Sequence, residues 1–189
     1  MRVDNLTKEI LELLGNNHTK VKVSNEYNSN YYNFLTDTIY LTSNINKIKR
    51  VKGLENANPF CGNLVTICHE CIHSVQDRRL HILNLILSNL SIALTIISLI
   101  LMFLLGKTLY FVIISAIIII DTILIRLTLE AQAITKSIWL ANKAIQKINI
   151  EKVQKDDVEQ AKSIIKKLMP LQIVHMIFDK IIMLVIVVI

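Results

Sequence analysis

Glycine and proline are scarce in this sequence, which holds four glycines and two prolines among 189 residues. Because these two residue types form tight turns and end helices, their scarcity argues against a turn-rich β fold and favours long helices. Charged side chains are absent from residues 83–105, which are almost entirely apolar. At about 1.5 Å per residue, a helix of this length reaches about 35 Å, which is enough to cross the hydrocarbon core of a bilayer.

Two further apolar stretches follow. The stretch 109–129 predicts a second span and is interrupted by Asp121 and Arg126. The stretch 171–189 is a weaker candidate for a third span and contains Lys180. Charges within a span are costly in lipid and usually find a partner, so we predict that Asp121 and Lys180 pair.

The distribution of positive charge predicts the topology. The chain carries a net charge of +6, and its lysines and arginines gather before the first span and after the second, while the turn between them holds only Lys107. Because positive residues mark cytoplasmic loops, residues 1–82 and 130–170 are both expected in the cytoplasm. The sequence therefore predicts a multi-pass protein of the cell membrane, in contact with the lipid bilayer. It lacks a basic tract interleaved with aromatic residues, so we expect no nucleic-acid partner.

The cysteines are few and odd in number: Cys61, Cys68 and Cys71. Together with an N-terminus that lacks the apolar core of a secretory signal, this argues against a disulfide framework and for a reducing cytosol. Cys68 and Cys71 form a Cys-x-x-Cys, which is typical of redox sites when it begins a helix. Because this pair falls in the middle of a predicted helix, we interpret both residues as packing residues.

Short elements precede the first span. The expected elements are a helix at 4–15, strands at 20–23 and 36–42, an Asn/Ser-rich loop at 24–33, and a helix at 64–79. Asn63 is the expected cap of that last helix, because Pro59 and Gly62 break the chain just before it. After the hairpin, 130–149 and 151–169 are predicted to be amphipathic helices.

The helix at 64–79 carries a His-Glu-x-x-His pattern at residues 69–73. Histidines four apart lie one turn apart on the same side of a helix, so the imidazoles of His69 and His73 can both bind one Zn²⁺. Glu70 then lies beside the metal, where it can take a proton from a zinc-bound water. In a chain of this composition the pattern arises by chance in about half a percent of cases. The alternative is a helix that carries two surface histidines.

A zinc peptidase site needs a third protein ligand from the same membrane face. Glu130 lies just after the second span and would complete a set of two histidines and one glutamate, and the small Ala133 one turn later would let its helix approach closely. The alternative is that Glu130 is a solvated charge at the membrane boundary. His81 is a competing third ligand, but on a continuous helix it lies about 12 Å along the axis from His73 and is too far away unless the helix breaks.

A resemblance to a known family rests on three segments: residues 32–41, the His-Glu-x-x-His-x-x-Gln pattern of His69, Glu70, His73 and Gln76, and the Glu-x-x-Ala of Glu130 and Ala133. In these segments, and over most of its length, the chain resembles the bacterial membrane neutral zinc metallopeptidases called YugP-like. The resemblance implies zinc, peptide-bond hydrolysis and an integral membrane location. The chain departs from the family at Ile72 and Ser74, where glycine and alanine are usual, and a bulky residue 72 is expected to crowd the cleft.

We therefore expect a mainly α fold with a small β element (α+β), combining a zincin-like catalytic core with a transmembrane helical hairpin and a C-terminal membrane helix. The predicted domains are 1–82 (cytosolic, with the strand and the motif helix), 83–129 (transmembrane hairpin), 130–170 (cytosolic helices with the third zinc ligand) and 171–189 (C-terminal membrane helix). The predicted function is a membrane-bound zinc metallopeptidase, a hydrolase of peptide or protein substrates with Glu70 as general base and its catalytic side in the cytoplasm. Two alternatives remain: a zinc-binding pseudoenzyme or membrane scaffold without protease activity, and a small membrane interaction protein without metal.

The strand at 36–42 has two interpretations. If it forms the edge of its sheet, Ile39, Tyr40 and Leu41 are the candidates for binding the substrate backbone by strand addition. If it does not, it is an ordinary strand of the sheet.

Overall fold

The structure, a computed structural model, describes residues 2–24, 26, 30–42, 59–105 and 109–148, and beyond these only 156, 157, 159, 160, 163, 174, 178, 180–183 and 185. The turn predicted at 106–108 lies outside the described residues, as do most of the predicted helix at 151–169 and most of the predicted span at 171–189. The described residues are mostly helical with one small sheet, which confirms the α+β class.

The chain forms two compact units. Unit 1 comprises Met1–Gln76 and Ala131–Pro170, and unit 2 comprises Asp77–Glu130 and Leu171–Ile189. The division falls inside one continuous helix, α4 (Leu109–Ile148), between Glu130 and Ala131. Glu130 is therefore joined by unbroken helix to the part of α4 that packs in unit 1.

The sheet of unit 1 has three strands, β1 (Lys20–Ser24), β2 (Tyr31–Asn33) and β3 (Thr38–Thr42), in the order β1-β3-β2. β1 runs parallel to β3, and β2 runs antiparallel to it. The expectation of a loop throughout 24–33 is wrong at β2, whose three residues are too few to show an alternating pattern. β3 is the middle strand of the described sheet, so the edge interpretation of this segment is wrong.

The first helix, α1 (Val3–Leu13), forms where the apolar periodicity predicted it. The side chains of Leu6 and Ile10 are buried in the core. The helix ends at Leu13, and Gly15 follows its C-cap Leu14 with a φ of 71°, a left-handed conformation that glycine adopts without strain. Lys143 of α4 donates a hydrogen bond from Nζ to the carbonyl of Leu13 at 3.2 Å, which satisfies one of the last carbonyls of α1.

The motif helix, α2, spans Pro59–Val75. It begins before the predicted start, so the expected break at Pro59 and Gly62 and the expected cap at Asn63 are wrong. Proline fits the first turn of a helix because the N–H it lacks has no partner within the helix there. α2 also ends earlier than predicted. The side chain of Asp77 accepts a hydrogen bond from the Arg79 N–H at 2.9 Å and so begins a new helix, α3 (Arg78–Leu105).

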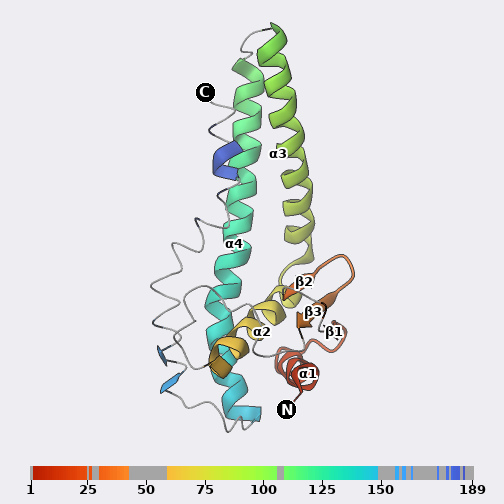
Figure 1. Cartoon of the computed structure of the whole chain (residues 1–189), viewed down its shortest axis with the longest axis vertical. Helices are drawn as coiled ribbons and strands as arrows, with labels where there is room; N and C mark the ends of the chain where they lie inside the picture. Colours follow the sequence, from red (N-terminus) through yellow and green to blue (C-terminus); the bar gives the residue numbers. More distant parts are fainter. Residues whose placement is uncertain are drawn as a thin grey trace. The chain divides into compact units, whose positions relative to one another are not determined.

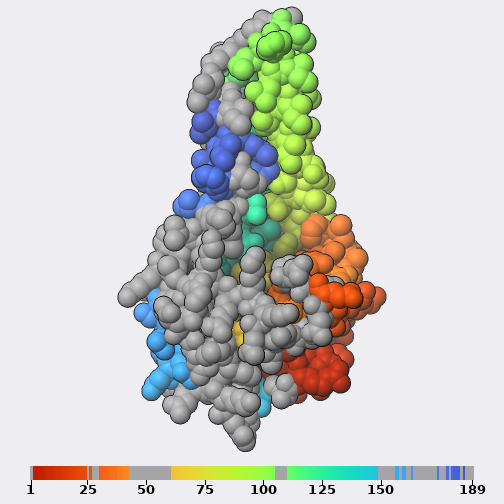
Figure 2. All heavy atoms as spheres, in the orientation of Figure 1, coloured from red at the N-terminus to blue at the C-terminus, as the bar shows by residue number. Residues whose placement is uncertain are grey.

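One hydrophobic core holds unit 1 together. It joins α1, β3, α2 and the later part of α4 through fully buried side chains such as Ile10, Ile39 and Leu64. Each such side chain contributes about 1.5–3 kcal/mol relative to exposure. Ala133, Ala141 and Ala144 bring only methyl groups from α4 into this core. Figure 2 shows α1 (red) and the strands (orange) along one flank of the unit.

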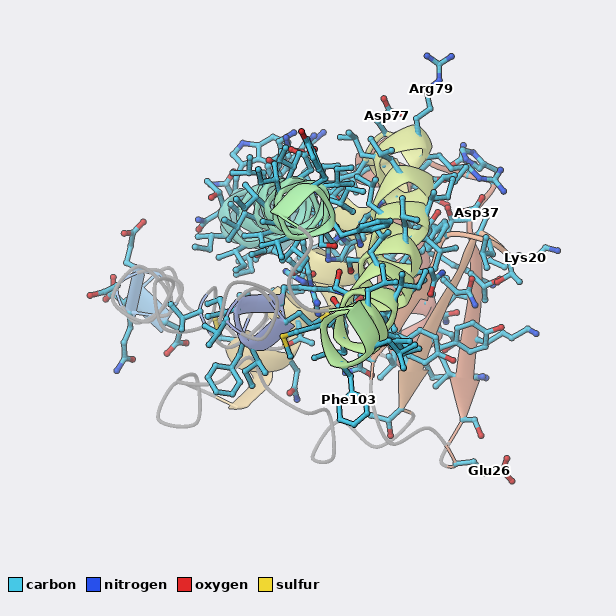
Figure 3. The ribbon with its side chains drawn as sticks, turned by 90° about the horizontal axis from the view of Figure 1, so that it is seen from above. Lys20, Glu26, Asp37, Asp77, Arg79 and Phe103 are labelled. Atoms are coloured by element: carbon cyan, nitrogen blue, oxygen red, sulfur yellow. The ribbon has the colours of Figure 1, made fainter. Side chains whose placement is uncertain are left out.

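In unit 2, α3 and the first part of α4 run side by side (Figure 1). A hydrogen bond of 3.0 Å between the hydroxyls of Ser98 and Ser115 joins them, and small hydroxyl residues are common where apolar helices pack closely. The segments Arg78–Leu104 and Tyr110–Ile148 are both long and apolar enough to cross a membrane. Apolar side chains cover the outside of unit 2, including Phe103, which is 90% exposed and projects away from α3 (Figure 3).

Lys180 lies fully buried in unit 2. Its Nζ donates hydrogen bonds to Ser91 Oγ at 3.1 Å and to the Ser88 carbonyl at 3.5 Å. The side chain of Asp121 is exposed, and no ion pair joins it to Lys180 among the described residues. The predicted pairing of Asp121 with Lys180 is therefore wrong. The Lys180 ammonium instead donates hydrogen bonds to a hydroxyl oxygen and a carbonyl oxygen of α3.

Candidate metal centre

Two imidazoles of α2 face each other. His69 Nε2 and His73 Nε2 are 3.0 Å apart, the ring centroids are 4.6 Å apart, and the rings are nearly perpendicular at 89°. The spacing of four residues along the helix puts both side chains on the same face, as the sequence predicts. The two nitrogens nearest each other are those that a single cation would bind.

Gln76 holds the ring of His73 in this orientation. Its Oε1 lies 2.7 Å from His73 Nδ1, on the opposite side of the ring from His69. A glutamine oxygen can only accept, so Nδ1 carries the proton and Nε2 keeps its lone pair. The neutral imidazole with a free Nε2 lone pair is the form that binds metals, and a partner of this kind fixes both the tautomer and the ring.

Removal of this partner is expected to weaken metal binding without abolishing it. We expect Gln76→Ala to lower the zinc affinity by about 10–100-fold, which is the range for the loss of a hydrogen-bond partner that orients a histidine ligand. Competition with a fluorescent zinc chelator measures the affinity. Gln132→Ala, which removes an exposed glutamine of α4, is the matched control and should leave the affinity unchanged. Equal affinities for Gln76→Ala and the control would contradict this role.

Glu130 supplies the third donor. One ligand atom from each of His69, His73 and Glu130 lies within 4.8 Å of the others, so this group can hold a metal ion. None of the three side chains is exposed. Ala133 lies one turn after Glu130 on α4, is fully buried, and belongs to the core that also contains Cys68 and Ile72 of α2.

Glu70 lies between the two histidines in the sequence and is 8% exposed. Its Oε2 accepts a hydrogen bond of 2.8 Å from the backbone N–H of Tyr32 in β2. No sequence pattern indicated this contact, because 38 residues separate the partners. Ile72 is fully buried and belongs to the hydrophobic core of unit 1, which also contains Cys68 and Ala133. That its bulk crowds a substrate cleft stays a prediction.

His81 was the competing third ligand. The helix does break between α2 and α3, which removes the argument from helical distance. Among the described residues, however, the group of side chains able to hold a metal contains Glu130 and does not contain His81. The geometry thus brings together the two histidines and the glutamate.

The three cysteines are free and fully buried. Burial raises the pKa of the Cys61 thiol to about 11, with a further contribution from the charge of Asp157. Burial also raises the pKa of Cys68 and Cys71 well above the ordinary value. Neutral thiols in a hydrophobic core are poor nucleophiles, which agrees with the interpretation of Cys68 and Cys71 as packing residues.

The residues proposed for substrate binding by strand addition lie in β3. From Thr38 to Tyr40 its backbone is paired on both sides, with β1 and with β2, so this part of the strand is not open to another strand. Ile39 and Leu41 are fully buried in the core. Tyr40 lies on the other face of the sheet, where its ring stacks on Tyr31 at 4.9 Å. The strand-addition role for Ile39, Tyr40 and Leu41 is therefore wrong, and the interpretation as an ordinary strand is confirmed.

The donor set fits zinc. Two imidazole nitrogens and one carboxylate oxygen are ligands that zinc commonly takes in catalytic sites. Bonds of about 2.0–2.1 Å at tetrahedral angles separate two nitrogens by roughly 3.3 Å. The observed 3.0 Å between the Nε2 atoms is close to this separation. Two uncharged imidazoles and one carboxylate also leave part of the metal charge uncompensated, as a Lewis acid requires.

Comparisons with known proteins add no relative. No protein-family model, no curated protein and no solved structure matches this chain. The function of the chain is therefore inferred from its own residues and their geometry. The resemblance to the YugP-like family stays a prediction.

Proposed function

We propose that this protein is a membrane-bound zinc metallopeptidase that hydrolyses peptide bonds with Glu70 as general base. One observation carries the proposal: a helix with His69 and His73 and a second helix with Glu130 bring three metal-binding side chains within 4.8 Å of one another. Glu70 directly follows His69 in the sequence. If the two histidines were a chance pair on the surface, a carboxylate from a helix about 60 residues further along the chain would not be expected next to them.

Each residue has a distinct part in the proposed reaction. When bound, a zinc ion supplies a Lewis acid that polarises the scissile carbonyl and acidifies water. His69, His73 and Glu130 hold this ion, and Gln76 keeps His73 in the binding tautomer. Glu70 takes one proton from the attacking water and passes it to the leaving amine, so that one water and one peptide bond become a carboxyl group and an amine.

A membrane location is part of the same proposal. The apolar helices α3 and α4 support insertion in the bilayer. α4 has 40 residues, which is about 60 Å of helix and roughly twice the thickness of the hydrocarbon core. Part of α4 therefore lies outside the lipid when the apolar part spans it, and Glu130 falls near the middle of the helix. The distribution of lysine and arginine favours the cytoplasm as the side of the metal centre and of the substrate.

The family resemblance supports the proposal at the same residues. His69, Glu70, His73 and Gln76 match the pattern of the YugP-like peptidases, and so do Glu130 and Ala133. We infer a zincin-like core on this basis. The helix that carries the histidines and the short β2 strand, whose Tyr32 N–H binds Glu70, support this inference.

Zinc-dependent cleavage of an unfolded protein by the purified chain in lipid nanodiscs tests the proposal. We expect cleavage that stops when a chelator removes zinc and returns when zinc is restored. Cleavage that persists in the metal-free protein would contradict the proposal. Bound zinc without cleavage of an unfolded protein or of a membrane-inserted peptide would also contradict it, in favour of the non-catalytic zinc scaffold.

A further inference from the structure

The hydrogen bond from Tyr32 to Glu70 depends on the placement of β2. Tyr32 pairs with Ile39 of β3. In an antiparallel pair, backbone groups point alternately toward the partner strand and away from it. The Tyr32 N–H points away from β3 and reaches Glu70 Oε2 at 2.8 Å. Any movement of this edge strand therefore moves a donor that orients the Glu70 carboxylate.

β2 is a weak element by itself. It has three residues, and the described sheet pairs it on one side only. Short edge strands open easily because few hydrogen bonds hold them. Tyr32 has a second anchor, however, since its phenol hydroxyl donates a hydrogen bond to Asp37 Oδ1 at 3.0 Å. The residue that presents its N–H to Glu70 is thus held at its backbone and at the end of its side chain.

Asp37 connects this anchor to the rest of unit 1. Its Oδ1 also accepts a hydrogen bond of 2.7 Å from the Thr19 hydroxyl, and its backbone carbonyl accepts one of 2.9 Å from the Lys20 N–H. Figure 3 shows Asp37 and Lys20 at the same end of the sheet. The carboxylate therefore ties the turn before β3 to the start of β1 and to β2.

The backbone of Asp37 is unusual. Its φ of 47° lies in the left-handed region, and it is the only non-glycine residue with a positive φ in the part of the chain that the structure describes. Such a conformation persists where the surrounding contacts over-determine it, and it occurs preferentially at functional sites. Asp37 accepts three hydrogen bonds, and these contacts hold its backbone in this conformation.

The connection continues back to α2. Asn16 is buried, and its Nδ2 donates hydrogen bonds to Thr19 Oγ1 at 2.9 Å and to Ser74 Oγ at 3.0 Å. Ser74 directly follows His73. It is also one of the two departures from the family pattern, and the hydroxyl that alanine would lack is the group that binds Asn16.

The contacts form a closed circuit that begins and ends on α2, one helical turn apart. Its members, in order, are Ser74, Asn16, Thr19, Asp37, Tyr32 and Glu70. The donors and acceptors are consistent throughout, because the Thr19 hydroxyl accepts from Asn16 and donates to Asp37. We propose that Asp37 is a positioning residue that holds β2 against α2 and thereby orients the Glu70 carboxylate through the Tyr32 N–H. Its effect on catalysis rests on the proposed function, whereas the tether itself does not.

Exchange of the Tyr32 amide hydrogen tests the tether without any need for activity. The chain has five tyrosines, so ¹⁵N-tyrosine labelling of the full chain in nanodiscs gives at most five amide signals. The signal that disappears in Tyr32→Phe belongs to Tyr32. We expect Asp37→Gly to accelerate exchange at this amide by about tenfold or more, because local opening no longer breaks the side-chain anchor. Glycine adopts a positive φ freely, so this variant deletes the carboxylate without straining the turn.

Two variants serve as controls. Asp37→Asn keeps an oxygen that accepts from both hydroxyls and tolerates the left-handed backbone, so exchange should stay close to wild type. Tyr31→Phe makes the same chemical change as Tyr32→Phe at the neighbouring residue of β2, and exchange at Tyr32 should not change. Unaltered exchange in Asp37→Gly overturns the proposal. Equal acceleration in Asp37→Asn or in Tyr31→Phe overturns it as well.

A second variant and two further measurements complete the test. If Asp37→Gly does not fold, Tyr32→Phe with ¹⁵N-phenylalanine gives a new amide signal for position 32, which should exchange faster than the wild-type tyrosine amide. Zinc content should be unchanged in every variant, since none alters a ligand. In cleavage assays, Asp37→Gly and Tyr32→Phe should lower kcat by about tenfold with little change in KM. Asp37→Asn should keep kcat close to the wild-type value. Exchange that accelerates while kcat stays unchanged would overturn the catalytic role and leave the proposed function standing.

Discussion

Glu70→Gln is expected to lower the rate of peptide cleavage by at least about 100-fold while the protein keeps its zinc. A positioned general base typically contributes about 10²–10⁴ to a rate, and an amide cannot take the proton of the attacking water. The substitution preserves shape, and the glutamine oxygen can still accept the hydrogen bond that the Tyr32 N–H donates to Glu70. The fold and the position of β2 should therefore be retained, so the loss reports the missing base.

Cleavage and zinc content are measured on the same preparations. Glu12→Gln makes the same chemical change at an exposed residue of α1 and serves as the matched control, with activity expected at the wild-type level. If Glu70→Gln cleaves at a rate similar to this control, Glu70 is not the base. If the variant loses its zinc, the residue belongs to the ligand set, which would contradict the assignment of roles within the motif.

The substitutions His69→Ala and His73→Ala are each expected to weaken zinc binding by more than about 100-fold, which exceeds the loss typical when only a hydrogen-bond partner of a ligand is removed. Each removes one of two nitrogens that lie 3.0 Å apart and leaves an incomplete set of ligands. Glu130→Ala should have a similar effect. Zinc per protein chain after dialysis, measured by elemental analysis, gives the result directly.

His81→Ala separates the two candidates for the third ligand. We expect this variant to keep its zinc, because the group that the structure brings together contains Glu130 and not His81. Loss of zinc in His81→Ala together with retention in Glu130→Ala would assign the third position to His81. A circular dichroism spectrum and a gel-filtration profile of each variant distinguish a lost ligand from a lost fold.

Local patterns in the sequence predicted the parts of the fold that local chemistry determines. The periodicity of Leu6 and Ile10 predicted α1, and the alternation that ends at Leu41 predicted β3. The His-Glu-x-x-His spacing alone placed His69 and His73 on one helix face, because a helix fixes the relation of residues four apart. The apolar runs predicted α3 and α4 because a long segment with few charges is typical of a membrane-spanning helix.

Relations between distant segments were not predictable in this way. The strand order depends on which segments meet after folding, so the sequence left the edge or middle position of β3 open. β2 forms because Tyr31–Asn33 meets β3, and three residues carry no periodic pattern of their own. The start of α2 at Pro59 was read as a break, since proline both ends helices and fits their first turn.

In the candidate site, too, the residues related by local spacing were predictable, and contacts between distant segments were not. The two histidines were visible as a motif, and Glu130 followed only from the topology argument and the need for a third ligand. The role of Gln76 had a signal in its spacing of three residues from His73, at the end of the helix, but no pattern states that its oxygen binds the far side of the ring. The Tyr32 donor to Glu70 and its anchor at Asp37 have no sequence signal, because backbone N–H groups are common to all residues.

X-ray absorption spectroscopy at the zinc edge, on the purified full chain in nanodiscs, tests the metal centre most directly. Two imidazole nitrogens and one carboxylate oxygen predict a first shell at about 2.0–2.1 Å, with the multiple scattering typical of histidine and no sulfur shell. A sulfur shell at about 2.3 Å would assign the metal to Cys68 and Cys71 instead, and a protein that binds no zinc would remove the basis of the proposed function.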